Sequence, residues 1–187
     1  MEVKQRCFGN KPNQAFYAHY HDYEWGIPVY DDQRLFEMLI LEGAQAGLSW
    51  ETILKKRPDY RLAYHNFVVA QVAEMRDLEL DGLCKNSALI RNRLKIYAAR
   101  QNAQVFLSIQ KEFGTFAKYL WAFVAGVPIV GVWSHFKEVP VQTDASELIA
   151  KDLKKRGMSF VGGKIIYAYM QAVGLVDDHL ANCWLRL

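Results

Sequence analysis

The first concentration of chemically capable side chains is residues 17–26, "YAHYHDYEWG". These ten residues hold three tyrosines, two histidines, one tryptophan and two acids. Aromatic faces bind flat or cationic rings, while imidazoles bind metal ions or transfer protons. A segment that served only to pack a core would consist mostly of hydrocarbon side chains. The composition therefore predicts that this segment contacts something other than its own core.

Glu42 is a second candidate, because it falls on the apolar face of a predicted helix. That face follows the i, i+3, i+4, i+7 spacing and comprises Leu35, Met38, Leu39, Glu42, Ala46 and Ser49. Glu37 falls off this face, and we expect it to be solvated. An unpaired buried carboxylate is costly, so Glu42 should have a partner or a shifted pKa. Gly43, Gly47 and Trp50 nearby favour a pocket with a carboxylate acceptor and an aromatic wall. The alternative is a glutamate that caps a neighbouring helix or pairs with a buried arginine.

His179 and Cys183 have the spacing of two metal ligands. On a helix, side chains four residues apart lie on one face and could share a metal ion. The spacing alone also arises by chance, and it supplies only half of a tetrahedral site. Cys7 and His21 are the best candidates for the other half, with His19 as a spare imidazole. Two cysteines and two histidines leave no place for water, so such a zinc site would be structural and would join the chain ends.

Basic residues cluster at positions 55–57, 91–95 and 154–156. The middle cluster follows two predicted helices joined by a short turn around residues 85–87. Free N–H groups at the start of the second helix form a natural phosphate site, and Arg91, Arg93 and Lys95 follow at once. Helix hairpins of this kind bind the DNA backbone without reading sequence. The alternative is an ordinary turn between helices with a solvated basic end.

The elements that must position these residues are nearly all helical. Caps, glycine stops and apolar periodicity predict helices over residues 31–47, 49–57, 59–67, 69–75, 77–84, 88–114, 116–126, 144–157 and 164–174. Residues 127–133 are the one candidate strand, and we expect it to lack a partner. No repeat or linker divides the chain. We therefore expect a single all-α domain over residues 1–187, with the two chain ends packed together.

Composition limits the class of protein. The 187 residues are 51% hydrophobic and 23% charged, with a net charge of +3, which is typical of a soluble globular protein. Three cysteines and no apolar signal core favour a cytoplasmic protein without a disulfide framework. The longest uncharged apolar stretch, residues 119–133, is too short to span a bilayer. We expect no membrane partner and a monomer.

Five stretches resemble one known family and occur in its order. They are "YHDYEWG", "LFEMLILEGAQAGLSWETILKKR", "IRNRLKI", "DLKKRGMSFVG" and "YMQAVGLVDDH". Together they resemble the 3-methyladenine DNA glycosylase I family of base-excision repair, over nearly the whole chain. The resemblance implies an all-α helix-hairpin-helix glycosylase fold, with the hairpin near residues 78–100. It also implies a structural zinc ion that joins the N- and C-terminal segments.

The resemblance assigns roles by position. Matches to the zinc ligands are Cys7, His21, His179 and Cys183. The residues that match the base pocket are Glu42, Tyr17, Tyr20, Trp25 and Trp50. In the family, the residue at Glu42 is the carboxylate that recognises the base, and the residue at Trp50 stacks on it. We expect Glu42, Tyr20 and Trp50 to support catalysis. Candidate contacts to the DNA backbone are Arg91, Arg93, Lys95 and Lys164. The chain departs from the family at four positions. Ala88 and Leu94 stand where members often or sometimes have glycine, Phe8 where some members carry tryptophan, and Lys164 where small or hydroxyl residues are usual.

The implied reaction is hydrolysis of the N-glycosidic bond of 3-methyladenine in double-stranded alkylated DNA after the base is flipped out. A cationic base leaves readily, so little acid–base help is required. Residues 82–111 contain no acid, although related helix-hairpin-helix glycosylases place a catalytic aspartate after the hairpin. We therefore expect a monofunctional enzyme without lyase activity. The rival interpretations are a DNA-binding module without enzymatic activity and a zinc hydrolase that uses His19 or His21.

Overall fold

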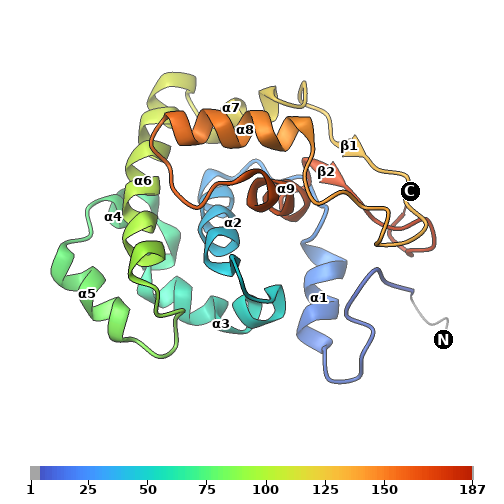
Figure 1. The fold of residues 1–187 in the computed structure, drawn as a ribbon, viewed down its shortest axis with the longest axis horizontal. Coiled ribbons are helices and arrows are strands. Elements are labelled where there is room, and N and C mark those ends of the chain that lie inside the picture. The colour runs from blue at the N-terminus through green and yellow to red at the C-terminus, as the bar shows by residue number, and fades with distance from the viewer. Residues whose placement is uncertain (1–4, 187) are drawn as a thin grey trace.

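The computed structural model describes residues 5–186, and it is almost entirely helical, as predicted (Figure 1). Its helices are α1 (Ala15–Tyr23), α2 (Asp32–Gln45), α3 (Trp50–Ala63), the 3₁₀ turn η1 (His65–Phe67), α4 (Val69–Ala73), α5 (Asp77–Lys85), α6 (Arg93–Phe113), α7 (Phe116–Ala122), α8 (Asp144–Lys155) and α9 (Gly163–Ala172). Two short strands, β1 (Ile129–Val130) and β2 (Val176–Asp177), complete it. No helix in residues 5–186 is long and apolar enough to cross a bilayer.

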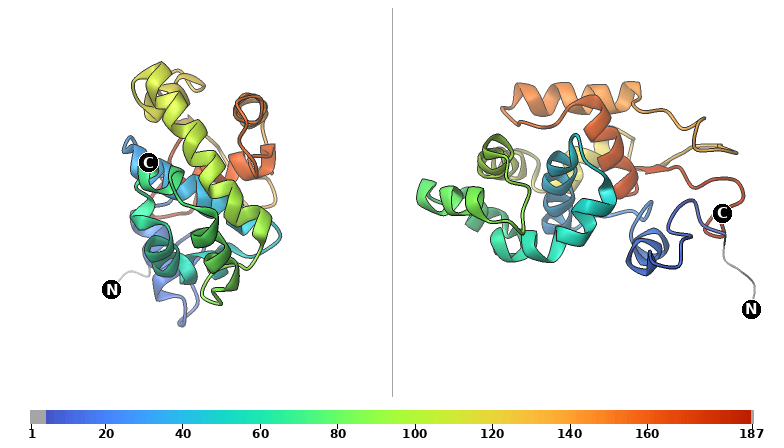
Figure 2. Two further views of the ribbon diagram at one scale, coloured as in Figure 1. Left: turned by 90° about the vertical axis from the view of Figure 1, so that its left-hand side faces the viewer. Right: turned by 60° about the horizontal axis from the view of Figure 1, so that its bottom comes forward.

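Helix α2 forms the centre of the fold, with α9, α6 and α3 packed around it (Figures 1 and 2). It begins where the Asp31 side chain accepts a hydrogen bond from the Arg34 N–H at 2.8 Å. Residues 35–44 of α2 are all buried. A helix that is enclosed on every side can hold a polar side chain rigidly, and α2 holds Glu42 in this way.

Glu37 corrects the expectation of a solvated acid, because its side chain is buried. Only 5% of Glu37 is exposed, and its carboxylate pairs with Arg57 at 2.8 Å, with Arg61 at 2.6 Å and with Arg34 at 2.8 Å. Helix α3 packs against the face of α2 that lies outside the predicted apolar face. Three arginines satisfy the carboxylate there, so the second face of α2 is buried by ion pairing rather than by hydrocarbon.

Helix α3 also differs from the prediction, because it continues through Pro58 to Ala63 instead of ending before the proline. Proline removes one backbone hydrogen bond and disfavours the helix interior. Contacts on both sides of Pro58 outweigh this cost: Arg57 and Arg61 both bind Glu37, and Tyr60 is buried. Helix α3 begins at Trp50 because the Ser49 hydroxyl accepts from the Thr52 N–H at 3.2 Å.

The connection between α5 and α6 is longer than the predicted turn. Helix α6 begins at Arg93, where the Asn92 side chain accepts from the Lys95 N–H at 3.2 Å. Residues 86–92 are therefore irregular, and Lys56 Nζ donates to the carbonyls of Ser87 at 3.1 Å and Ala88 at 2.8 Å. Side chains distant in sequence fix this segment, so local helix propensity did not reveal its length.

The candidate strand has a partner, contrary to expectation. Strand β1 pairs in parallel with β2, with Ile129 opposite Val176. The partner lies near the end of the chain, where no alternating pattern marks a strand. The first and last described segments meet, because the Trp184 backbone N–H donates to the Gln5 carbonyl at 2.9 Å (Figure 2).

Candidate active site

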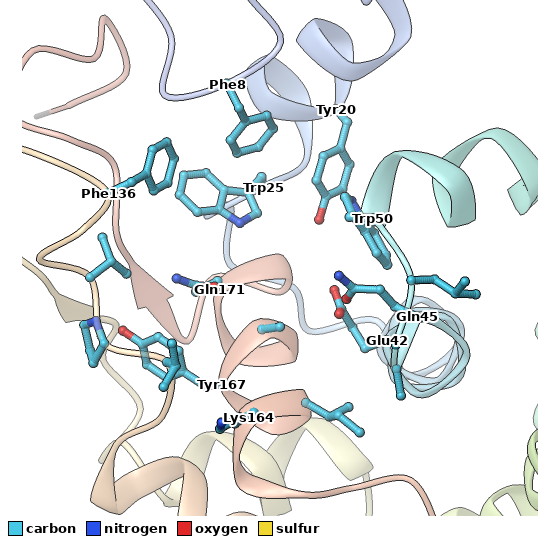
Figure 3. A pocket seen from close by; sticks show the side chains of 18 of the residues that line it. Phe8, Tyr20, Trp25, Glu42, Gln45, Trp50, Phe136, Lys164, Tyr167 and Gln171 are labelled. Atoms are coloured by element: carbon cyan, nitrogen blue, oxygen red, sulfur yellow. The ribbon is translucent and has the colours of Figure 1, made fainter.

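One cavity of about 680 Å³ brings together every residue predicted to contact a base. Tyr17, Tyr20, Trp25, Glu42 and Trp50 all line it. Helix α1 and the segment after it supply the upper wall in Figure 3, and the end of α2 and start of α3 supply one side. Helix α9 and residues 136–141 supply the opposite side. The predicted pocket therefore exists, and its walls come from segments far apart in the sequence.

Glu42 lies in this cavity as a buried and unpaired carboxyl group. Only 3% of the residue is exposed, and within residues 5–186 its Oε2 atom has no hydrogen-bond partner. Burial raises the pKa of Glu42 from its ordinary value of 4.5 to about 8. The pairing and capping alternatives thus do not apply to Oε2. A group of this kind favours a ligand that brings hydrogen-bond donors or a positive charge.

Aromatic rings surround the carboxyl group. The centroids of the Tyr20 and Trp50 rings lie 5.5 Å apart, and Tyr17 stacks on Phe8 at 4.6 Å. Trp25 meets the same Phe8 edge to face at 5.1 Å. Phe8, which stands where some relatives carry tryptophan, therefore keeps an aromatic contact at that position. Burial raises the pKa of Tyr20 well above its ordinary value, so its hydroxyl stays protonated and can donate.

Sequence reasoning missed the far wall of the cavity. Phe136, Tyr167 and Gln171 line it, together with Lys164, which is exposed at the start of α9. Tyr167 and Gln171 are four residues apart, so both lie on one face of α9. Their spacing was the available signal, but an aromatic and an amide on an apolar helix resemble ordinary core positions.

Cys7, His21 and Cys183 form a compact cluster of possible metal ligands. Their ligand atoms all lie within 4.8 Å of one another, and Cys183 Sγ is 3.4 Å from His21 Nε2. His179 lies beside them, with its ring centroid 5.2 Å from that of His21. Residues 179–183 form no helix, so the four-residue spacing of His179 and Cys183 does not place them on one helical face. A turn closed by the His179 N–H and the Asp177 carboxylate, 3.0 Å apart, brings His179 to the cluster instead.

The two histidines are oriented like metal ligands. His21 Nδ1 lies 2.9 Å from the Asp22 carboxylate, and His179 Nδ1 lies 2.7 Å from the Asp177 carboxylate. Carboxylates at Nδ1 orient the Nε2 atoms of metal-bound histidines in this way. Within residues 5–186, His179 Nε2 is buried and has no hydrogen-bond partner. This orphaned atom, on a ring whose centroid lies 5.2 Å from that of His21, fits a fourth ligand for a zinc ion held by the cluster.

The four predicted DNA-backbone residues lie in different environments. Arg91, Arg93 and Lys164 are exposed. Arg93 pairs with Asp81 and donates to the Tyr97 hydroxyl at 3.0 Å. Lys95 is engaged within the fold, because its Nζ donates to the carbonyls of Ala44 at 2.9 Å and Ala46 at 2.6 Å. This geometry favours a cap on the last turn of α2, rather than the predicted phosphate contact, as the role of Lys95.

An all-helical fold with an aromatic cavity and a buried carboxyl group fits a protein that binds a flat, cationic ring. The chain belongs to the methyladenine glycosylase family, whose profile matches residues 10–186.

Relatives agree with this assignment. The DNA-3-methyladenine glycosylase of Haemophilus influenzae is 47% identical over 170 residues, which cover 91% of this chain and 92% of the relative. A crystal structure of 3-methyladenine DNA glycosylase I is 43% identical and has a TM-score of 0.93. The match covers 98% of this chain and 100% of that chain. A tyrosine-to-phenylalanine variant of such an enzyme, solved in complex with 3-methyladenine, is 36% identical with a TM-score of 0.89 over 91% of each chain.

Proposed function

We propose that this protein is a base-excision-repair glycosylase that hydrolyses the N-glycosidic bond of 3-methyladenine in double-stranded alkylated DNA. The observation that carries the proposal is the unpaired Glu42 carboxyl group, buried inside an aromatic cavity. The family match and the relative in complex with 3-methyladenine support it. As part of the same proposal, residues 1–187 act as one monomeric domain in the cytoplasm.

Base recognition begins with flipping the damaged nucleotide out of the duplex, which costs a few kcal/mol and least for a damaged pair. Methylation at N3 makes the adenine ring cationic. The faces of Trp50, Trp25 and Tyr17 attract such a ring, each by roughly 0.5–2 kcal/mol. Glu42 accepts a hydrogen bond from the exocyclic amine or pairs with the positive charge. Neutral adenine leaves the carboxyl group poorly paired, and this difference discriminates against undamaged DNA.

Bond cleavage needs little further help, because the cationic base is a good leaving group. Glu42 is the one acid among the residues that line the cavity, and the Tyr20 hydroxyl is the nearby neutral donor. We infer that water attacks directly. Arg91, Arg93 and Lys164 are the exposed cations that would hold the DNA backbone.

The absence of a covalent step gives a direct prediction. Lys164 lies at the rim of the cavity, where an unprotonated amine could in principle form a Schiff base with the sugar. For a monofunctional glycosylase, borohydride treatment during turnover yields no trapped enzyme–DNA adduct, and the abasic strand stays intact until alkali is added. A bifunctional glycosylase with its own lyase activity, run in parallel, shows that trapping works. A trapped adduct that disappears in Lys164→Met would disprove direct hydrolysis.

A structural zinc ion held by Cys7, His21, His179 and Cys183 is part of the proposal. Four protein ligands close the coordination shell, so the ion supplies no water for chemistry. Its role is to fasten the N-terminal arm, which carries Phe8, to the C-terminal tail. Phe8 contacts Tyr17 and Trp25, so the metal supports the aromatic wall indirectly.

The pKa of Glu42 predicts how excision depends on pH. The ionised carboxylate is the form that binds a cation. With a pKa of about 8, the ionised fraction of Glu42 increases as pH rises toward 8. We expect kcat/KM for 3-methyladenine release to rise about tenfold between pH 6 and 7, to rise less between 7 and 8, and to level off above. Single-turnover kcat should vary less, because the bound cation lowers the pKa of Glu42. A kcat/KM that is flat from pH 6 to 8 would contradict ionisation of Glu42 in the free protein.

One assay separates the proposal from its rivals. Methylated duplex DNA is incubated with the protein, and free bases are separated by chromatography, with and without a brief treatment with chelator. The proposal predicts release of 3-methyladenine that survives chelation for as long as the protein stays folded. A DNA-binding module would bind without releasing a base. A zinc hydrolase would lose its activity at once.

A further inference from the structure

Another buried carboxylate, Asp178, lies behind the cavity wall that faces Glu42. Only 1% of Asp178 is exposed. Its Oδ2 accepts hydrogen bonds from the Tyr167 hydroxyl at 2.6 Å and from Gln171 Nε2 at 2.7 Å. Its Oδ1 accepts from Trp133 Nε1 at 2.6 Å. Three short, charge-assisted hydrogen bonds satisfy an ionised carboxylate, so Asp178, unlike Glu42, is fully paired within the protein.

Asp178 joins two parts of the far wall. Tyr167 and Gln171 are one turn apart on α9, and both line the cavity. Trp133 begins the loop that carries Phe136 to the same cavity. A side chain at Gly131 would collide with both the Trp133 indole and the Asp178 carboxylate, so the backbone packs directly over this hydrogen bond. The wall is therefore fastened to one buried carboxylate.

The hydrogen bond to Asp178 decides which way the Gln171 amide points. A glutamine amide can present either its NH₂ group or its carbonyl oxygen, but a carboxylate only accepts hydrogen bonds. The NH₂ group of Gln171 must therefore face Asp178. The carbonyl oxygen is the part of the amide that remains for the cavity. Gln171 lies across the cavity from Glu42 in Figure 3, so two acceptors border the cavity from opposite sides.

We propose that Gln171 is a specificity-determining residue for the base, and that Asp178 is the positioning residue that turns its carbonyl oxygen toward the cavity. This inference rests on the proposed function. The partial negative charge of the carbonyl lies against the edge of the cationic ring that Glu42 does not contact. An amide turned the other way would direct N–H groups at a positive ring. By fixing the orientation of the Gln171 amide, the buried Asp178 carboxylate makes the contact at that edge of the base attractive rather than repulsive.

The first test removes the amide and keeps the length of the side chain. For Gln171→Met we expect single-turnover release of 3-methyladenine from methylated duplex to be about tenfold slower, with KM for the DNA within about twofold. Gln101→Met is the matched control, because it makes the same substitution on the exposed side of α6. A rate within about twofold of the unsubstituted protein would overturn the role of Gln171. Failure of the unsubstituted protein to release 3-methyladenine would instead overturn the proposed function.

The second test exchanges the polar groups of the pair. Asp178→Asn alone lets the Gln171 amide turn over, and we expect a rate loss of about fivefold to tenfold. In the double variant Gln171→Glu/Asp178→Asn, the new asparagine donates to the new glutamate, whose second oxygen again faces the cavity as an acceptor. We expect the double variant to recover most of the rate lost by Asp178→Asn. A purely structural pair would change the melting temperature but leave the rate of the folded single variants unchanged, and that outcome would contradict the inference.

Discussion

Replacing Glu42 with glutamine should lower single-turnover release of 3-methyladenine by about a hundredfold or more, because it removes the only acidic side chain among the described residues that line the cavity. Glutamine has the same shape, so the aromatic walls and the path of α2 are kept. Binding of undamaged duplex should stay within about twofold, since exposed arginines and lysines make those contacts. The measurement is chromatographic release of free base at saturating enzyme.

The same substitution should stabilise the fold at alkaline pH. Folded Glu42 holds a proton up to a pKa of about 8, whereas an unfolded glutamate releases it near 4.5. The free energy of unfolding therefore falls as pH rises from 4.5 to 8, by roughly 1.4 kcal/mol per unit at most. Glutamine removes this loss but leaves a buried amide unsatisfied, at about 1–3 kcal/mol. We expect Glu42→Gln to gain about 1–3 kcal/mol at pH 8 and to lose up to about 2 kcal/mol at pH 5, where the ionisation loss that it removes is below about 1 kcal/mol.

Urea unfolding at the two pH values measures this gain. Glu74→Gln is the matched control. Glu74 directly follows α4, its side chain is exposed, and it does not line the cavity. It should change neither excision nor the pH dependence of unfolding. If Glu42→Gln excises 3-methyladenine at nearly the normal rate, the proposed recognition is wrong. If its stability relative to the unsubstituted protein is no greater at pH 8 than at pH 5, folding does not raise the pKa of Glu42.

Replacing Cys183 with serine should remove the zinc ion and most of the stability that the chain ends contribute. Serine is a poor zinc ligand, and Cys183 Sγ lies within the cluster formed with Cys7 and His21. Because metal binding is coupled to folding, we expect a loss of about 3–5 kcal/mol and a fall in melting temperature of roughly 10 °C. Elemental analysis should find about one zinc per chain before the substitution and almost none after it.

Cys84→Ser is the matched control, because Cys84 is partly buried on α5 and lies outside the cluster. It should retain zinc and lose much less stability. The folded fraction of Cys183→Ser should still excise 3-methyladenine, since Cys183 does not line the cavity. Absence of zinc from cleanly purified protein would contradict the ligand assignment altogether.

Local patterns predicted most of the helices, but not α1, which carries Tyr17, Tyr20 and His21 in a segment expected to be irregular. Glu42 was found because a charge interrupts an apolar helical face, and burial then explains its pKa. Glu37 was misjudged by the same rule, because a periodic pattern cannot show that arginines from α3 cover the other face of α2. Pro58 misled for a similar reason, since the contacts that keep α3 continuous come from another helix.

Features assembled from distant segments could not be derived from spacing alone. The partner of β1, the far wall with Tyr167 and Gln171, and the capping role of Lys95 all depend on how segments meet in space. His179 shows the point most clearly: its spacing from Cys183 would place both side chains on one face only in a helix, but a turn places it beside the cluster. Its role as a metal ligand stays a prediction.

The most direct test of the account is the ionisation state of Glu42, measured by NMR of its ¹³C-labelled side-chain carboxyl group. In the free protein the account predicts an apparent pKa of about 8. In complex with duplex DNA that carries an uncleaved 3-methyladenine nucleotide, whose base is still cationic, it predicts an ionised carboxylate at pH 7, because a cationic ring beside the group lowers its pKa. The signal is identified by its loss in Glu42→Gln. A free-protein pKa near 4.5, or a carboxyl group that remains neutral in the complex, would contradict recognition of the base by charge.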